Sequence, residues 1–381
     1  MSSFRPLFKA EIELEYNGPP GRLCPPGRPC CHIQIGRKKY CSFFITKPRL
    51  FDSVDTVSLV SPDLDLANVA AGLPDLRATL DALPDDGRYI AASAGDRAVL
   101  RVGVQGGIES GAANLLAKKM TTLVMVLEGS LLLKLAAPAC KFQGRYRRID
   151  PVCQESHVAQ DRWPYMGAVS SDYDSHVPPI EAIKPATWNN QDPEHVCRVL
   201  SRIWSTPSRE DLQSILKCRG VNCDFYLVPE NREYRPEWWR LPQNGPLVTS
   251  YKGPKEYRTW FCFRYLQTTF EHRLLRNWVE VIARIVELAL AGPDEYKKCL
   301  ETIFRIQHDA DQVDPDADQG GVAWEKLMID VLKLEHRIED WRDQINRYEQ
   351  GEVIVNPPKD SFLAKRMGPY DSRDDRTNYW Y

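Results

Sequence analysis

The sequence has almost no net charge, no long hydrophobic run and no paired metal-binding motif, and each absence excludes a class of function. Among 381 residues, 50 basic and 52 acidic side chains leave a formal net charge of −2. A nearly neutral chain has no long-range attraction to nucleic acid or to an anionic lipid surface, so we expect neither as a partner. The most apolar segment, 121–137, contains Glu128 and Lys134 and is too short to cross a bilayer. We interpret it as part of a buried helix.

The sequence also lacks a recognisable leader. Its first residues, MSSFRPLFKAEIELEY, are charged and run directly into a predicted strand. The eleven cysteines are an odd number and are spread from Cys24 to Cys299. In a chain of this size we expect free thiols in a reducing compartment. These features predict a cytoplasmic protein.

The densest group of potential zinc ligands lies in a turn-rich segment near the start of the chain. Its members are Cys24, Cys30, Cys31, His32 and Cys41. Structural zinc sites normally use closely paired cysteines, and this segment contains no CxxC spacing. The sequence therefore favours an unliganded loop over a zinc site.

A second group has the spacing of a calcium loop. Asp314, Asp316, Asp318 and Glu325 match positions 1, 3, 5 and 12 of an EF-hand loop, between two predicted helices. However, Gln319 stands where that loop needs glycine for its turn. The sequence favours a solvated acidic loop that stabilises the N-terminus of the next helix, and calcium is not expected.

The hydrophobic patterns predict an α+β protein, built on an antiparallel, twisted sheet with helices on one side and a helical C-terminal part. Strands are predicted at residues 9–16, 31–36, 56–60, 98–105, 245–251 and 257–266. Helices are predicted at residues 66–83, 113–137, 193–205, 209–217, 271–291, 294–307, 322–334 and 336–350.

We divide the chain into three parts. Residues 1–292 form the α+β domain, with a loop-rich excursion at 151–193 whose prolines are compatible with a lid over a site or with a simple connection. Residues 293–350 form a helical extension packed on this domain. Residues 351–381 mix prolines, charges and aromatic residues and are predicted to be a flexible tail.

The opening strand alternates acidic and apolar residues with a period of two. It places Glu11, Glu13 and Glu15 on one face, where like charges about 6–7 Å apart repel each other. Water can solvate these acids. Alternatively, a divalent cation or arginines of neighbouring strands can compensate them. The choice between these possibilities decides what the protein can do.

Two later strands carry basic residues at the same spacing. Arg101 lies on the polar face of strand 98–105, and Arg264 lies on that of strand 257–266. Spacing alone favours three ordinary antiparallel strands with solvated outer faces. If the strands are neighbours, however, one face gathers four charged residues: Glu11, Glu13, Arg101 and Arg264.

Five short segments follow one another in a family-like order. FKAEIE contains Glu11 and Glu13, SLVSP occupies 58–62, VLRVGVQ occupies 99–105 before the long helix with Glu128, and WFCFR at 260–264 precedes LLRNWV at 274–279. They resemble the FGxExE, ELVSP, GLHVHVG, TIEFR and IxxWV patterns of the amidoligases, ATP-dependent carboxylate–amine ligases with a glutamine-synthetase-like fold. The resemblance covers about residues 8–290.

The resemblance implies a reaction in which ATP phosphorylates a carboxylate and an amine then displaces phosphate to give an amide. Glu11 and Glu13 would hold magnesium and ATP, and Arg264 would bind phosphate or the substrate carboxylate. The chain departs from the family at four positions. Where the family has Glu, His, His and Glu, the residues are Ser58, Arg101, Gly103 and Cys262.

We therefore expect an amidoligase-like protein with an eroded site, weakly active or inactive, whose residual activity would use ATP and magnesium. Arg101 and Arg264 are the candidate catalytic residues. Their guanidinium groups can also pair with Glu11 and Glu13 and partly replace the metal. Two alternatives stay open: an active amidoligase joining a small-molecule or peptide carboxylate to an amine, and a non-catalytic module that binds a protein or peptide.

Overall fold

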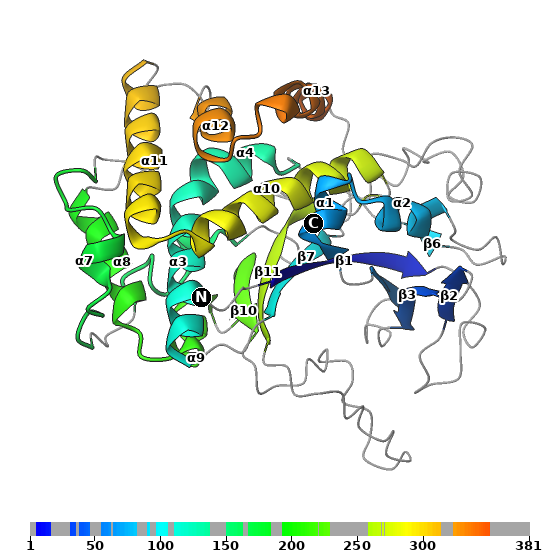
Figure 1. Cartoon of the computed structure of the whole chain (residues 1–381), viewed down its shortest axis with the longest axis horizontal. Helices are drawn as coiled ribbons and strands as arrows, with labels where there is room; N and C mark the ends of the chain where they lie inside the picture. Colours follow the sequence, from blue (N-terminus) through cyan, green and yellow to red (C-terminus); the bar gives the residue numbers. More distant parts are fainter. Residues whose placement is uncertain are drawn as a thin grey trace, which may run out of the picture.

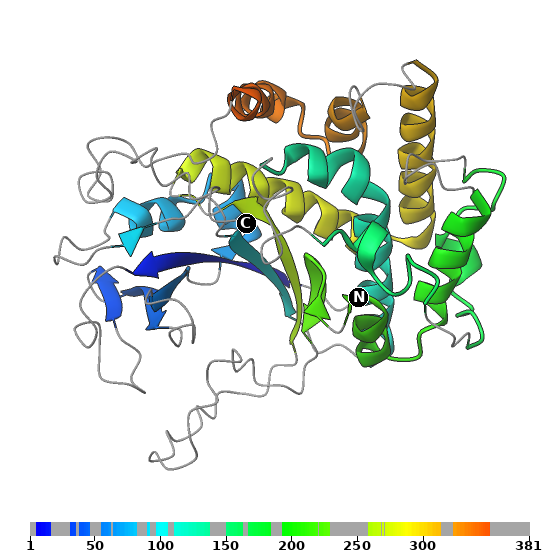
Figure 2. The same cartoon turned by 180° about the vertical axis from the view of Figure 1, so that it is seen from behind.

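The computed structural model shows an open sheet with long helices packed across one side (Figures 1 and 2). It describes residues 5–16, 31–35, 38–45, 55–61, 64–81, 90–91, 97–105, 110–137, 150–162, 167–183, 193–219, 221–228, 258–267, 269, 271–313 and 323–350. The predicted α+β class with an antiparallel sheet is confirmed.

Every strand pairing in the described residues is antiparallel. The main sheet has the order β10-β11-β7-β1-β4-β3-β2, and β5 and β6 also pair with β1. Its strands are β1 (Arg5–Tyr16), β2 (Cys31–Ile35), β3 (Lys38–Ile45), β4 (Asp55–Val60), β5 (Leu64–Asp65), β6 (Ile90–Ala91), β7 (Arg97–Gln105), β10 (Phe225–Val228) and β11 (Arg258–Gln267). A small second sheet pairs β8 (Lys217–Cys218) with β9 (Val221–Asn222).

Alternate residues of the central strands point into the core, as the period of two requires. The buried set is Phe8 and Ala10 on β1, Leu100 and Val102 on β7, and Phe261 and Phe263 on β11. These residues share one hydrophobic cluster with α3 (Ser110–Leu127) and α10 (His272–Leu290). The opposite set of positions forms what we call the outer face of the sheet.

The other helices surround α3 and α10. They are α6 (Val152–Glu155), α7 (Tyr173–His176), α8 (Pro193–Ser205), α9 (Arg209–Ile215), α11 (Pro293–Val313), α12 (Ala323–Lys326) and α13 (Ile338–Glu349). The predicted buried helix at 113–137 is α3, continued by a π-helical segment, Glu128–Leu132, and by α4 (Leu133–Leu135). Buried residues of the excursion and of α11 belong to the same cluster as the sheet.

One predicted helix is divided in two. Residues 66–83 were expected to be continuous, but the structure has α1 (Leu66–Ala70) and α2 (Pro74–Asp81). Gly72 and Leu73 between them have φ angles of 82° and 60°. The N–H of Leu73 donates to the carbonyl of Asn68 and closes the end of α1. The left-handed backbone conformation is incompatible with a continuous helix.

Six of the described strands were not predicted. Five of them are short, with two to four residues each: β5, β6, β8, β9 and β10. The sixth, β3, has eight residues. The predicted strand at 245–251 and the predicted tail at 351–381 lie outside the described residues. Among the helices that the structure does describe, none combines the length and the apolar character needed to cross a membrane.

Candidate functional site

The three strands predicted to carry polar residues are neighbours in the sheet. β7 lies between β1 and β11 and pairs with both. Arg101 of β7 stands directly opposite Lys9 of β1 and Cys262 of β11. The candidate site is therefore a set of adjacent ladder positions on the outer face, drawn from three segments that are far apart in the sequence.

Glu11 stands close to Arg101 in the ladder. Glu11 pairs directly with Val99, and Arg101 is two residues along β7 from Val99. Such diagonal neighbours are roughly 7–8 Å apart, within reach of long side chains. Two cationic residues, Lys9 and Arg101, are opposite each other, an arrangement that an adjacent acid would relieve. The side chains of Glu11 and Glu13 are not among the described ones, so their predicted ion pairs stay predictions.

Arg264 reaches the outer face from a β-bulge in β11. Between Phe263 and Leu266 the register with β7 shifts, so that two residues of β11 oppose one of β7. The Arg264 N–H donates to the carbonyl of Asp224 at 2.8 Å, and its guanidinium lies 5.1 Å from the centre of the Tyr226 ring. One strand separates β11 from β1, so the backbones of Arg264 and the acids are roughly 10 Å apart. Arg101 is thus the nearer cation to Glu11.

Gly103 is covered by the indole of Trp260, its partner in the ladder. A Cβ atom built at Gly103 would lie 2.8–3.0 Å from three atoms of that ring. Contacts this short require one of the two groups to move. Glycine at this position therefore permits the Trp260 ring to lie close to the backbone of β7, and a larger residue at 103 would displace the ring.

The middle of the outer face is apolar and buried. Val99, Tyr226 and Cys262 form a small cluster separate from the main core, with Val228 packed against it. Cys262 is 0% exposed. A buried thiol in apolar surroundings is chemically inert, so Cys262 is a packing residue rather than a nucleophile. The cationic side chains of Arg101 and Arg264 border this cluster and remain half-buried.

The described residues contain no group of three or more His, Cys, Asp or Glu side chains arranged to hold a metal. Glu325, the last residue of the calcium-like pattern, instead accepts hydrogen bonds from Arg342 Nε and Nη2 at 2.8 and 2.7 Å. The rest of that pattern, and the side chains of the cysteine–histidine group, lie outside the described residues. Glu11 and Glu13 have the oxygen atoms that magnesium prefers, but their ladder partners supply no further carboxylate.

The most extensively hydrogen-bonded carboxylate is on the core side of the sheet. Glu128 is fully buried and accepts hydrogen bonds from the backbone N–H groups of Val152 and Cys153, at 2.9 and 2.6 Å, and from the hydroxyl of Tyr265. Burial raises the pKa of Glu128, while hydrogen bonds from Cys153 and Tyr265 oppose that rise. Burial, and then the charge of Glu128, raise the pKa of Cys153 and of Tyr265.

Sequence analysis did not identify this cluster as a unit. The one available signal was a single glutamate within an apolar helix, and its partners come from two other segments. The cluster fastens the chain around residue 152 to the π-helical segment that follows α3 and to β11. The N–H groups of Val152 and Cys153 and the hydroxyl of Tyr265 all donate to Glu128. We therefore interpret this cluster as a structural anchor that is distinct from the outer face.

Neither the models of known protein families nor the curated protein sequences contain a match to this chain. The function must therefore be argued from the geometry. Two guanidinium groups at the edge of a buried apolar strip suit an anion with paired oxygen atoms, such as a carboxylate or a phosphate.

Proposed function

We propose that this chain is an amidoligase-like protein with a glutamine-synthetase-like sheet, in which the ATP-dependent ligase site is eroded and turnover is slow or absent. The observation that carries the proposal is the contiguity of β1, β7 and β11. Three of the segments on which the family resemblance depends lie on these neighbouring strands, and their candidate site residues share one face.

The four positions that depart from the family pattern also belong to one surface. Ser58 pairs with Glu13 across β4 and β1, and Arg101 pairs with Cys262 across β7 and β11. At Gly103, the Trp260 ring fills the space that a histidine would need. The departures thus lie on the same face of the sheet as Glu11 and Glu13, and this supports erosion of a single site over scattered drift.

The metal requirement of the ligase reaction also supports an eroded site. Phosphorylation of a carboxylate by ATP brings several negative oxygen atoms together, and magnesium ions normally neutralise them. Glu11 and Glu13 would suffice for one ion that keeps several waters, but not for a second. Arg101 and Arg264 would still bind phosphate or carboxylate through fixed charges. This residue set favours anion binding over efficient ligation.

Replacement of Arg101 by histidine tests the proposal. Arg101→His removes the permanent charge and restores the family residue beside Glu11, so we expect magnesium-dependent binding of a non-hydrolysable ATP analogue to tighten about tenfold, roughly 1.4 kcal/mol. Isothermal titration calorimetry with and without magnesium measures the change.

Two control variants accompany this experiment. Arg198→His changes an exposed arginine of α8 and should leave binding unaltered. Arg101→Gln removes the charge without adding a metal-binding nitrogen, and it should gain less than Arg101→His. If none of the variants gains magnesium-dependent nucleotide binding, the ligase ancestry of the site is refuted, and a module binding a protein or peptide becomes the better account.

A further inference from the structure

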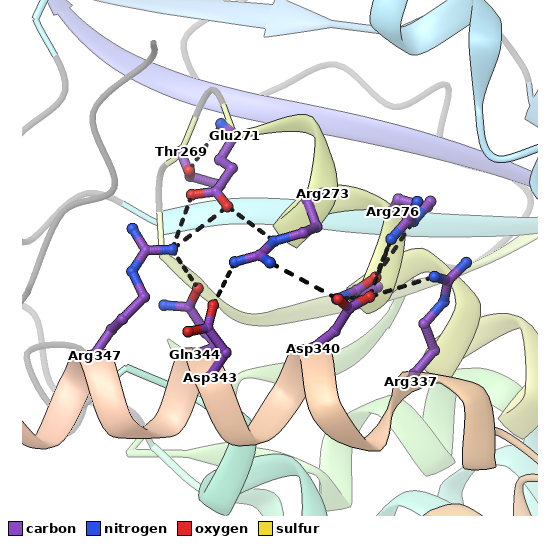
Figure 3. A network of polar contacts seen from close by, with 10 residues as sticks. Thr269, Glu271, Arg273, Arg276, Arg337, Asp340, Asp343, Gln344 and Arg347 are labelled. Carbon is purple, nitrogen blue, oxygen red and sulfur yellow. Dashed lines mark hydrogen bonds and ion pairs between the residues drawn. The ribbon is translucent and has the colours of Figure 1, made fainter. Parts of the chain in front are cut away.

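The C-terminal helix α13 meets the first half of α10 through a network of ion pairs (Figure 3). Arg273 contacts Asp343 at 2.6 Å and Asp340 at 3.8 Å, and Arg276 contacts Asp340 at 3.2 Å. The Arg273 and Asp343 side chains are 41% and 53% exposed. Dissolved salt screens charges at such accessible positions. This part of the contact is therefore sensitive to ionic strength.

The apolar part of the contact between α13 and α10 also buries polar N–H groups. Trp341 of α13 is fully buried against Trp278 of α10, with ring centres 5.4 Å apart and planes at 90°. Both indole N–H groups and the side-chain NH₂ of Gln344 are buried, and none of them has a hydrogen-bond acceptor within the part of the chain that the structure describes. Buried donors that lose water without gaining an acceptor oppose docking. Three such donors in one contact weaken an otherwise well-packed interface.

The network also reaches the end of the strand that carries Arg264. Arg347 of α13 contacts Glu271 at 3.3 Å, and Glu271 is the N-cap residue of α10. The Glu271 side chain makes no capping bond to its own helix. Only a few residues separate Glu271 from Gln267, the last residue of β11. The position of α13 is thus coupled to the junction between β11 and α10.

We propose that α13 is a strap that docks reversibly on α10, and that ionic strength and competing charged ligands set how often it is docked. In the docked state Arg347 of α13 holds Glu271 and fixes the start of α10. In the released state the indole N–H groups of Trp278 and Trp341 and the side-chain NH₂ of Gln344 can donate hydrogen bonds to water. This device is independent of any ligase activity, because it involves none of the outer-face residues.

Hydrogen exchange of the full chain, followed by mass spectrometry at about 0.05 M and 0.5 M sodium chloride, tests the strap. We expect amides of α13 to exchange roughly tenfold faster at the higher salt concentration, as weakening of several exposed ion pairs would produce. Amides of α11, which lies outside the ion-pair network of Figure 3, should be unaffected. The double variant Asp340→Asn/Asp343→Asn should show the faster exchange already at low salt.

The matched control is Glu349→Gln, which removes an exposed carboxylate at the end of α13 that lies outside the network. It should exchange like the unaltered protein. Exchange of α13 that is indifferent to salt and to the double variant would overturn the proposal, as would loss of protection in α13 and α11 together. If the double variant does not fold, the salt titration of the unaltered chain decides the question.

Discussion

At the scale of single residues, burial and partners decide what each charged group does. Glu128 and Arg101 are both isolated polar residues within apolar stretches of sequence. In the structure, Glu128 is enclosed by donors on the core side, whereas Arg101 borders the outer face among other charged positions. The two residues therefore call for different tests: a stability measurement for Glu128 and a binding measurement for Arg101.

Glu128→Gln should destabilise the fold. The substitution preserves size but turns one acceptor oxygen into an NH₂ group that faces donors from Val152, Cys153 or Tyr265. We expect a loss of about 2–3 kcal/mol in the free energy of unfolding, measured by urea denaturation. Glu301→Gln, on the exposed side of α11, is the control and should change stability by less than about 0.5 kcal/mol. Equal effects for both variants would refute the anchor role.

The burial of Lys119 predicts that the free energy of unfolding depends on pH. It is buried in α3, donates to the carbonyl of Ala291 at 2.5 Å and lies 4.6 Å from the centre of the Tyr296 ring. Burial lowers its pKa from 10.5 to about 8, and Glu295 partly opposes this shift. Between these two values the unfolded chain binds more protons than the folded one, so the free energy of unfolding rises with pH through this window.

Lys119→Met should remove the contribution of Lys119 to the rise in the free energy of unfolding with pH. Denaturant unfolding at a series of pH values from about 7 to 10 would show a smaller rise in the variant than in the unaltered protein. Lys326→Met, at an exposed position of α12, should leave the pH profile intact. A profile that is identical with and without Lys119 would mean that its ammonium group is not desolvated in solution.

At the scale of elements, the hydrophobic periodicity predicted the long amphipathic helices well. It did not predict the interruptions within them. α8 has the predicted bounds, and α10 agrees within one residue at each end. The break between α1 and α2 depends on two residues with positive φ, and a π-helical segment, Glu128–Leu132, continues α3. Neither feature alters the hydrophobic pattern. The short strand β10 is defined by its pairing with β11 rather than by its own four residues.

The break makes Gly72 a position where backbone conformation, not space, limits substitution. Its φ is 82°, and a Cβ atom there would lie 3.8 Å from the nearest side chain, that of Arg276. Gly72→Ala should therefore lower the free energy of unfolding by about 1 kcal/mol through backbone strain. Gly111→Ala, near the start of α3 with open space around it, should instead be neutral or slightly stabilising. Thermal melts of both variants measure the contrast, and a stabilising Gly72→Ala would contradict this account.

At the scale of the whole molecule, the sheet order joins segments that are remote in sequence. β1, β7 and β11 become neighbours although more than 80 residues separate β1 from β7 and more than 150 separate β7 from β11. α3 and α10 cover the core face of the same strands (Figure 2). The candidate site is therefore a property of the topology, and a ligand that binds it should stabilise the entire fold.

Addition of ATP with magnesium to the full chain should raise the melting temperature by a few degrees, because a ligand that binds only the folded state stabilises it. Turnover of ATP under the same conditions should be slow or absent, owing to the missing metal ligands. ATP without magnesium is the control for non-specific anion effects. No shift and no turnover would leave a protein- or peptide-binding module as the function.

The sequence by itself determined the α+β class, the antiparallel character of the sheet and most helix positions, because local periodicity reports which side of an element is buried. It also identified the charged residues Glu11, Arg101 and Arg264, because polar residues at every second position of a strand are visible without coordinates. Only the tertiary structure decided that their strands are neighbours, that Trp260 fills the space above Gly103, and that Glu128 is enclosed on the opposite side. These facts depend on strand order and register, which arise from contacts between distant segments and leave no local pattern in the sequence.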